Sequence, residues 1–546
     1  MSKSDTIDRV HLTLAKGRSG SVSGFRSLSG TEFLEIEYGG AVGHVPRLMF
    51  LDQQPAAKIL LARQKVVVMS KKDWAEIIKG VEEVDDFPPR PIVDRLGWTD
   101  NYFALRDGKV YSPARQPKAQ LVSSTALGGD AKSGTFARWM KQIAEPLAGQ
   151  SLPMVAVLAA MAAPLLRHSG LTHNPGLELC GPRGKGKTLL LRLAISVADN
   201  PNKLPTFDAT RIGLSKISEN YEDRIFPVDE GSHVDRADGH FFQSFVFGMA
   251  SGTSRLTAFQ TEIYESRFIL MTTANRSYHE SLSHLDHETR AAALDRLLPL
   301  SVDPDNDLGV FDFLPEGFAT SGEFARNLEQ GMNALFGVAM RRLLHSIVNT
   351  KAKDPASFVA SLGADIHAFE TAVGVASSPQ GRTRPSSSFG LFYAAGAFAQ
   401  RRGILPETWD CMSACVAAFR NYQAQLPECT PLAARLMMIV DRPETLDLRN
   451  IELPRLPDED FKAHGAFVKN GKNGRTELLI TDDKVDRYFP DWRSLSSSTE
   501  FKTLNLRDRD HRTKQRQVRK GHKKERLVCF VLPTDLVKQI DGNQAA

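Results

Sequence analysis

The sequence predicts an α/β protein whose central part is a parallel sheet covered by helices on both faces. Short apolar runs at 177–180, 225–228, 268–272 and 297–302 alternate with helical or hairpin segments. This alternation is typical of parallel strands joined through helices. The first run also leads into a glycine-rich turn and a helix over 188–198, which is the local arrangement that a phosphate-binding loop requires.

The chain of 546 residues is longer than one hydrophobic core usually supports, so we expect three or four domains. Short β-type runs fill the N-terminal part, and residues 102–111 have a hairpin pattern around Asp107-Gly108 that suits a type I′ turn. The expected parts are an N-terminal β-rich domain, a linker, a core built around the phosphate-binding loop (P-loop), a helical domain, a second linker and a small, basic, winged-helix-like tail. Their predicted bounds are 1–112, 113–134, 135–310, 311–440, 441–460 and 461–546.

Composition favours a soluble protein, with 42% hydrophobic and 24% charged residues. The N-terminus has no signal-peptide pattern. The longest apolar stretch, 152–166, is shorter than the roughly 20 residues that cross a membrane, so we expect a buried helix, a cytoplasmic protein and no membrane partner. The five cysteines are too few and too scattered for a disulfide framework or a zinc site.

The segment that best indicates chemistry matches the pattern GxxxxGK[ST]. Glycines let backbone N–H groups curl around a phosphate, the lysine places a positive charge on the β- and γ-phosphates, and the final hydroxyl binds Mg²⁺. The following helix directs its positive end at the phosphates. The pattern predicts ATP and Mg²⁺ as cofactors, bound by Gly181, Pro182, Arg183, Gly184, Lys185, Gly186, Lys187 and Thr188, with Lys187 also catalytic and Thr188 also a metal ligand.

Polar residues follow two further strands of the expected sheet. Asp229 and Glu230 end the second apolar run, where Asp229 would hold Mg²⁺ and Glu230 would act as general base toward the attacking water. Asn275 ends the third run and is placed to orient that water or to contact the γ-phosphate. Each pattern alone also fits a surface turn, so the prediction depends on their position after the phosphate-binding loop.

An arginine just before the fourth strand is the candidate for a group that acts on a neighbouring subunit's nucleotide. Arg296 is the favoured arginine finger and Arg290 the second choice, with a surface salt bridge as the alternative for either. Other classes with this loop fit less well, because the GTPase NKxD, the helicase DExD/H and an ABC-type signature are all missing from the sequence.

The net charge of +5 is unevenly distributed along the chain. Between 507 and 526 there are ten Lys and Arg residues and three Asp and Glu residues, which indicates a local basic patch that binds nucleic acid. A solvated loop is the alternative. The candidate phosphate contacts are Arg516, Arg519, Lys520, Lys523 and Lys524.

Residues from about 90 to 425 resemble a prokaryotic family known as domain of unknown function 927. The resemblance is carried by LELCGPRGKGKTLLLRLAISVADNP, FVFGMASGTSRLTAFQ and RTRPSSSFGLFYAAGAFAQRRGIL. It implies an AAA+-like, superfamily-three-like helicase-type ATPase of mobile elements. The resemblance implies a protein that forms a ring, most often of six subunits, and moves DNA. By the same resemblance Arg255 lies in a pore hairpin that grips DNA, and Arg382 or Arg384 is a second sensor arginine.

The function implied is an ATP-hydrolysing DNA helicase or translocase in mobile-element or phage-type replication, with single- or double-stranded DNA and replication or defence proteins as partners. The alternative is an ATP-switched assembly module of a defence or DNA-binding regulatory complex that unwinds nothing. One departure concerns Pro227, because a proline in a strand removes a hydrogen-bond donor and puts the strand's register in question.

Overall fold

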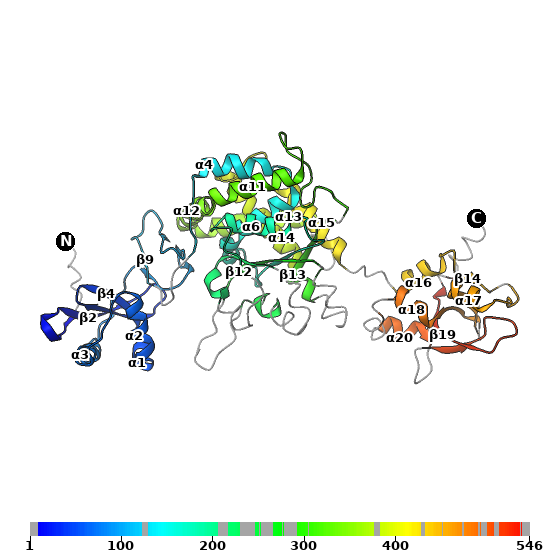
Figure 1. The fold of residues 1–546 in the computed structure, drawn as a ribbon, viewed down its shortest axis with the longest axis horizontal. Helices are drawn as coiled ribbons and strands as arrows, with labels where there is room; N and C mark the ends of the chain where they lie inside the picture. Colours follow the sequence, from blue (N-terminus) through cyan, green and yellow to red (C-terminus); the bar gives the residue numbers. More distant parts are fainter. Residues whose placement is uncertain are drawn as a thin grey trace. The chain divides into compact units, whose positions relative to one another are not determined.

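The chain forms two compact units in the computed structural model, one of residues 1–278 and 295–423 and one of residues 279–294 and 424–546 (Figure 1). The structure describes residues 9–122, 129–205, 217–229, 246–250, 252, 266–275, 277, 292–303, 305–375, 383–426, 432–449, 451–471, 474–489, 492, 499–506, 513–534 and 537. Each unit is considered by itself below.

The N-terminal region combines an antiparallel sheet with three helices. The strands lie in the order β1 (Val10–His11), β2 (Gly20–Arg26), β3 (Glu32–Tyr38) and β4 (Ala41–Pro46), with the short turn η1 (Ala15–Gly17) between the first two. The helices are α1 (Arg47–Asp52), α2 (Gln54–Arg63) and α3 (Lys71–Glu82). The expected β-rich domain is therefore not confirmed as such, because helices supply much of the core around Phe50, Leu61 and Ile77.

A second group of short strands connects this region to the central sheet. Strands β5 (Ile92–Val93) and β9 (Gln120–Leu121) pair in parallel, and β6 (Gly97–Thr99), β7 (Tyr102–Ala104) and β8 (Val110–Tyr111) form an antiparallel meander. The hairpin expected over 102–111 is present, but its turn differs. Gly108 has φ 86° while Asp107 is not left-handed, so the loop is a three-residue turn that ends in a glycine, not type I′.

The four strands expected from the apolar runs form one parallel sheet. They are β10 (Gly176–Cys180), β11 (Arg224–Val228), β12 (Phe268–Ala274) and β13 (Leu297–Ser301), in the spatial order β11-β12-β10-β13. Pro227 lies in β11 and Pro299 in β13, the two edge strands of the described sheet. A proline is tolerated at such an edge because its missing N–H needs no partner there.

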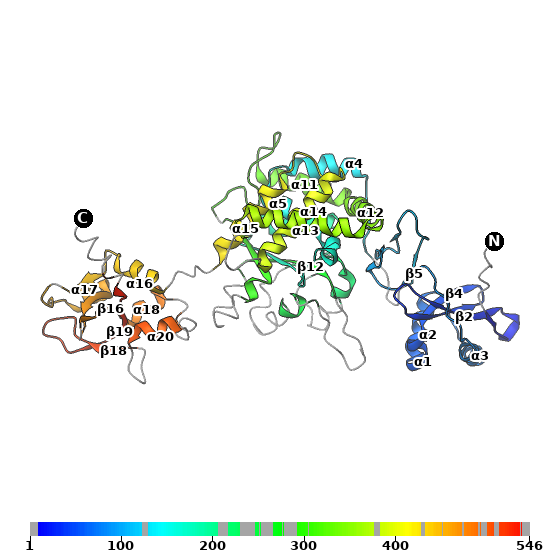
Figure 2. The same cartoon turned by 180° about the vertical axis from the view of Figure 1, so that it is seen from behind.

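Helices α5 and α6 pack against β11 and β12, and α4, α11, α12, α13 and α14 lie on the same side of the sheet in Figures 1 and 2. Cover on the second face stays a prediction. The helices are α4 (Phe136–Trp139), η2 (Met140–Ala144), η3 (Glu145–Leu147), α5 (Ser151–Ala162), η4 (Ala163–His168), α6 (Lys187–Ser196), η5 (Glu219–Tyr221), α11 (Ser321–Ala334), α12 (Val338–Lys353), α13 (Pro355–Ala372), α14 (Arg384–Arg401) and α15 (Cys411–Gln425).

Segment Ser151–His168 is long and apolar enough to cross a membrane by length and composition, but 78% of it is buried inside the protein. This burial fits the core helix expected from the sequence. Within the helical domain expected over 311–440, helices α11 and α12 follow one another with a short break between them. Gly337 separates them with φ 71°, and a side chain there would overlap the carbonyl oxygen of Ala131.

The second unit is built on a mixed sheet in the order β14-β15-β16-β19-β17, with β18 also paired to β19. A winged-helix arrangement is not confirmed, because this sheet and not a helical cluster forms the centre of the unit. Its elements are α16 (Leu432–Val440), β14 (Leu446–Asp447), α17 (Asp458–His464), β15 (Ala466–Asn470), β16 (Thr476–Thr481), α18 (Asp482–Tyr488), α20 (Thr499–Leu504), β17 (Asn505–Leu506), β18 (Lys514–Arg516) and β19 (Glu525–Val531).

Candidate nucleotide-binding site

The loop between β10 and α6 has the backbone that its glycines predict. Gly181, Gly184 and Gly186 have φ values of 140°, 80° and 95°, which residues with a Cβ rarely adopt. A Cβ on Gly186 would lie 2.8 Å from Cγ2 of Val310, whereas the same position on Gly184 meets no atom within 4 Å. The loop is thus packed at its end and open at its middle, where a phosphate group would approach.

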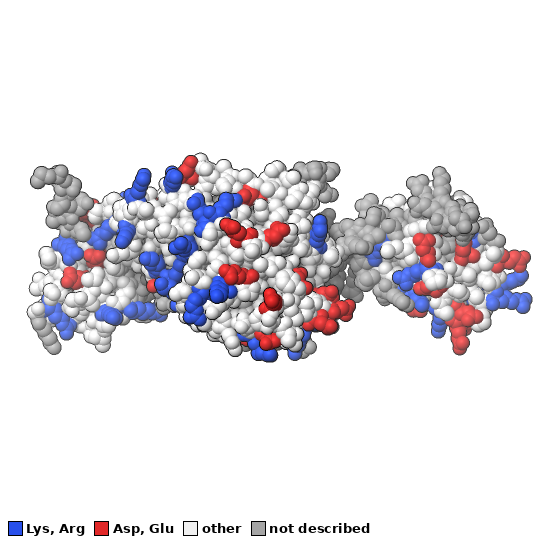
Figure 3. All heavy atoms as spheres, turned by 90° about the horizontal axis from the view of Figure 1, so that it is seen from above, with Lys and Arg blue, Asp and Glu red and all other residues white. Residues whose placement is uncertain are grey.

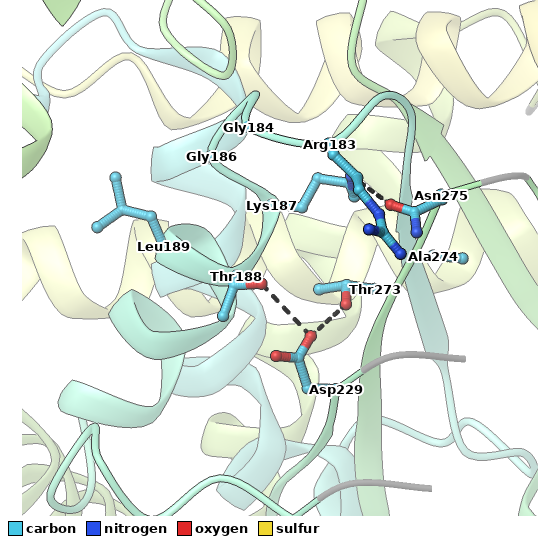
Figure 4. A pocket seen from close by; sticks show the side chains of 10 residues that line it. All are labelled: Arg183, Gly184, Gly186, Lys187, Thr188, Leu189, Asp229, Thr273, Ala274 and Asn275. Atoms are coloured by element: carbon cyan, nitrogen blue, oxygen red, sulfur yellow. Dashed lines mark hydrogen bonds between the residues drawn. The ribbon is translucent and has the colours of Figure 1, made fainter. Parts of the chain in front are cut away.

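Lys187, the first residue of α6, extends its ammonium group into this loop. Its Nζ donates hydrogen bonds of 2.7 Å to the carbonyl oxygens of Gly181 and Pro182, and lies 3.4 Å from Oδ1 of Asn275 (Figure 4). Burial lowers the pKa of Lys187, while the carboxylate of Asp229 acts in the opposite direction. The ammonium is therefore a positive charge held by neutral acceptors, and an anionic oxygen would bind it more strongly.

Asp229 follows β11 and faces the start of α6. Its Oδ1 accepts a hydrogen bond of 3.5 Å from the hydroxyl of Thr188 and a second, shorter one from the hydroxyl of Thr273 at the end of β12 (Figure 4). A carboxylate and a hydroxyl at this separation are the oxygen ligands that Mg²⁺ prefers beside phosphates. The donor set present therefore fits a magnesium ion.

These groups surround one cleft of about 480 Å³ at the carboxyl ends of β10, β11 and β12. Ligands of open parallel sheets usually bind at this edge. We call it the carboxyl edge, defined by the residues that line the cleft: Arg183, Gly184, Gly186, Lys187, Thr188, Leu189, Asp229, Thr273, Ala274 and Asn275. The structure thus brings the phosphate-binding loop, Asp229 and Asn275 together as the sequence predicts.

Thr273 was not predicted as a site residue from the sequence. The two polar residues Thr272 and Thr273 at the end of a buried strand could have indicated it. Polar residues at the end of a buried strand seldom serve packing alone. Glu230, Arg255, Arg290 and Arg382 lie outside the described residues, so their roles stay predictions.

Arg296 lies at the opposite end of the sheet from the phosphate-binding loop. It directly precedes β13, whose first residue, Leu297, pairs with Gly176, the first residue of β10. Its guanidinium packs 4.5 Å from the centre of the Phe247 ring. Burial lowers the pKa of Arg296, and the charge of Arg384 adds to this effect.

Two groups of buried charges hold the amino ends of the strands, which we call the amino edge. In the first, Arg167 forms ion pairs with Glu222 and Asp223, and an oxygen of Asp223 accepts a hydrogen bond of 2.9 Å from the N–H of Trp98. Burial, together with the negative charge of Asp223, raises the pKa of Glu222 to about 8. Gly97 permits this contact, since a side chain there would overlap the Asp223 carboxylate.

The second group contains two arginines and two aspartates. Arg106 pairs with Asp130 at 3.2 Å and with Asp199 at 2.8 Å, and the fully buried Arg224 also pairs with Asp130. These four residues come from the β7–β8 hairpin, the segment before α4, the end of α6 and the start of β11. The group therefore joins distant parts of the chain and has equal numbers of opposite charges.

Two of the five tail residues proposed to bind nucleic acid have carboxylate partners. Arg516 makes hydrogen bonds of 2.6 and 2.7 Å to both oxygens of Glu477, and Arg519 is 6% exposed and pairs with Asp458 and Glu525. These pairs hold β18 and the segment after it against the sheet, a structural role that the charge run did not reveal.

The other three tail cations are more accessible. Lys520 is exposed and pairs at 3.1 Å with the exposed Glu452, and Lys523 and Lys524 are exposed side chains before β19. Nucleic-acid binding by these residues stays a prediction.

The comparisons with known proteins concern the family and the fold of the chain. The family "Domain of unknown function (DUF927)" matches residues 26–263. The resemblance expected over about 90–425 is confirmed for residues 90–263, and the match also extends to residues 26–89, where no resemblance was expected. No curated protein matches the chain.

One solved structure covers nearly the whole chain. A structure titled "SCCmec type IV Cch - active helicase" aligns over 97% of this chain and 97% of its own, with a TM-score of 0.59 and 13% identity. The apo structure of the C-terminal region of NrS-1 aligns over 65% of this chain and 79% of its own at 11% identity, with a TM-score of only 0.23. The chain thus shares the fold of a structure titled as a helicase. A sequence identity of 13% supports a shared fold and no more.

Proposed function

We propose that this chain is an ATP-hydrolysing, AAA+-type DNA helicase or translocase of mobile-element or phage-type replication. The observation that carries the proposal is the meeting of Lys187, Thr188, Asp229 and Asn275 at one cleft on the carboxyl edge. This combination of a cation, a hydroxyl, a carboxylate and an amide fits Mg²⁺ and a nucleoside triphosphate together.

Each side chain has a role that follows from its position. Bound Mg·ATP supplies the phosphoanhydride bond that is hydrolysed. Lys187 would exchange its carbonyl partners for phosphate oxygens, and Thr188 and Asp229 would hold the metal. Thr273 keeps the Asp229 carboxylate directed at Thr188, which makes it a positioning residue. Asn275 would orient the attacking water, from which Glu230 would take the proton.

The position of Arg296 supports a ring. An arginine at the amino edge is separated from its own phosphate-binding loop by the length of β10. It would act as arginine finger only on the nucleotide of a neighbouring subunit, as in a closed head-to-tail assembly. We expect a hexamer in the cytoplasm, with DNA bound through Arg255 in the pore and through Lys520, Lys523 and Lys524 in the tail.

The experiment that tests the proposal is steady-state ATP hydrolysis by the full chain, with and without single-stranded DNA, beside the Glu230→Gln variant. We expect hydrolysis that DNA stimulates and that the substitution abolishes while ATP binding is retained. Hydrolysis unaffected by DNA would contradict a DNA motor and favour an ATP-switched assembly module. Absence of both binding and hydrolysis would overturn the assignment of the cleft.

A further inference from the structure

Helix α12 is basic without any acidic residue. Its sequence, VAMRRLLHSIVNTKAK, has four Lys and Arg residues and no Asp or Glu. Arg342 and Lys353 are exposed and lie eleven residues apart, which places them on the same face of the helix, about three turns from one another. This face is positive over most of the helix length, about 24 Å for 16 residues.

Segments far away in the sequence add further cations beside α12. Arg341 pairs with Asp107, which brings the β7–β8 hairpin and Lys109 to the first turn of α12. The N–H of Ala114 donates a hydrogen bond of 3.0 Å to Asn349, which places the neighbouring Arg115 beside the fourth turn.

The start of α12 is also flanked by cations from the segment that leads into α4. The backbone of Lys132 lies close to Gly337, and the Arg342 guanidinium lies 5.8 Å from the centre of the Phe136 ring in α4, which also carries Arg138. We call the resulting surface the α12 basic face and define it by six exposed residues: Lys109, Arg115, Lys132, Arg138, Arg342 and Lys353.

These six side chains carry charges that the described protein does not neutralise. None of them forms an ion pair within the described part of the chain. Figure 3 looks down on the side of the core where α4, α11 and α12 lie in Figure 1. It shows Lys and Arg gathered over one half of the core and Asp and Glu more frequent over the other. Unpaired cations on one surface fit a polyanion.

The chemistry of this face distinguishes a nucleic acid from an acidic protein. Protein interfaces usually contain large apolar side chains at their centre. The large apolar residues exposed in the described structure lie elsewhere, at Val42, Leu48, Leu51, Ile59, Val67, Met69, Phe313, Val359, Met438 and Ile451. A phosphate backbone needs no such centre, because released counterions supply most of the binding free energy. A face about 24 Å long spans roughly seven base pairs at 3.4 Å per step.

We infer that the α12 basic face is a nucleic-acid binding surface that holds the phosphate backbone outside the nucleotide cleft. The inference rests on the proposed function, in which the motor acts on DNA, and it adds a contact surface on the ATPase core to those predicted for the pore and the tail. Contacts here are to phosphates, so we expect little dependence on base sequence.

The test is the salt dependence of DNA affinity in a charge-reversal variant. Arg138→Glu, Arg342→Glu and Lys353→Glu are combined in the full chain, and fluorescence anisotropy is measured with labelled oligothymidylate and with a labelled duplex across a NaCl series. We expect at least tenfold weaker binding, and a log–log salt slope smaller by about 0.7 per lost contact for the single strand or about 0.9 for the duplex.

A matched control reverses three exposed cations at comparable helix positions away from the face. Lys72 lies in the first turn of α3, Arg420 in the second half of α15 and Arg63 at the end of α2. The control triple variant should keep the affinity and the salt slope of the wild type. Both triple variants should retain basal ATP hydrolysis without DNA and the wild-type unfolding temperature.

Each of the following results would overturn the inference. Equal loss of affinity in both triple variants would mean that net charge, and not this face, controls binding. Unchanged DNA affinity in the test variant, together with a smaller oligomer by light scattering, would assign the face to a neighbouring subunit. If the wild type itself binds no DNA, the inference and the DNA part of the proposed function fail together. If the wild type binds DNA and the test variant binds it equally well, the inference fails while the proposed function stands.

Discussion

The two edges of the central sheet both carry charged residues, but the two sets differ in their burial and in their partners. At the amino edge, Arg106, Arg224, Asp130 and Asp199 are buried and paired with one another. At the carboxyl edge, the ammonium of Lys187 donates its hydrogen bonds in the described structure to neutral carbonyl and amide oxygens, beside an open cleft. The comparison shows that buried charges which form ion pairs with one another stabilise the fold. Charged side chains that line the cleft can instead bind a ligand.

The largest effect is expected at the carboxyl edge. Lys187→Ala removes the charge that would stabilise the transferring phosphoryl group, so ATP hydrolysis should fall by about 100-fold or more. The free energy of unfolding should change little, because the ammonium forms no ion pair with the described residues that the substitution would remove. A steady-state ATPase assay and a thermal melt on the same sample check both parts. A variant that loses much of its stability but hydrolyses ATP normally would contradict this view, because Lys187 would then stabilise the fold and not bind a ligand.

At the amino edge, Gly97→Ala should lower the free energy of unfolding without a direct effect on ATP hydrolysis. The new Cβ meets the Asp223 carboxylate and forces a left-handed backbone on alanine, at a cost of about 2–3 kcal/mol. Urea unfolding should show the loss, and ATP hydrolysis per folded molecule should remain near wild type at low temperature. Gly108→Ala is the matched control, because it also has positive φ but meets no atom within 4 Å.

The buried acids of the amino edge should make stability depend on pH. The folded state keeps a proton on Glu222 up to about pH 8, whereas the unfolded chain releases it near the ordinary pKa of 4.5. Stability from this group is therefore full below pH 4.5 and is lost as pH rises toward 8. Glu222→Gln should flatten the slope in this window and raise the free energy of unfolding at pH 8 by about 1–3 kcal/mol. Part of the slope should remain, since burial also raises the pKa of Asp223. An unchanged slope by urea unfolding would show that Glu222 is ionised when folded.

The smallest effect is expected for Thr273, whose hydroxyl donates a hydrogen bond to the Asp229 carboxylate. Thr273→Val removes the hydrogen bond that directs Asp229, so the Mg²⁺ concentration for half-maximal hydrolysis should rise by about tenfold. Saturating Mg²⁺ should restore most of kcat, and Thr273→Ser should behave like wild type. A fall in kcat that excess Mg²⁺ does not restore would assign Thr273 a role other than metal positioning.

Local patterns were enough to predict the carboxyl edge. The strand, the glycine turn and the helix around Lys187 are consecutive in the chain, and Asp229 and Asn275 each end an apolar run, so their convergence follows from a parallel sheet. The amino edge depends on contacts between Arg106 and Asp199 or between Trp98 and Asp223, separated by 93 and 125 residues. Neither pattern nor propensity reports such pairs.

Two other departures have separate physical reasons. The break between α11 and α12 comes from the close approach of Ala131 to Gly337, a tertiary contact that helix propensity cannot show. Helix α3 was missed although its signals are local. Ser70 caps its first turn through the N–H of Asp73, and apolar residues recur at helical spacing through Ile77 and Val81.

The single most direct measurement is calorimetric titration of the full chain with a slowly hydrolysed ATP analogue, with and without Mg²⁺, for the wild type and for Asp229→Asn. We predict one binding event per chain that strengthens with Mg²⁺ in the wild type, and no strengthening in the variant, because Asp229 and Thr188 would hold the metal at the carboxyl edge. Binding that strengthens equally with Mg²⁺ in both proteins would contradict the assignment of the cleft as a magnesium–nucleotide site.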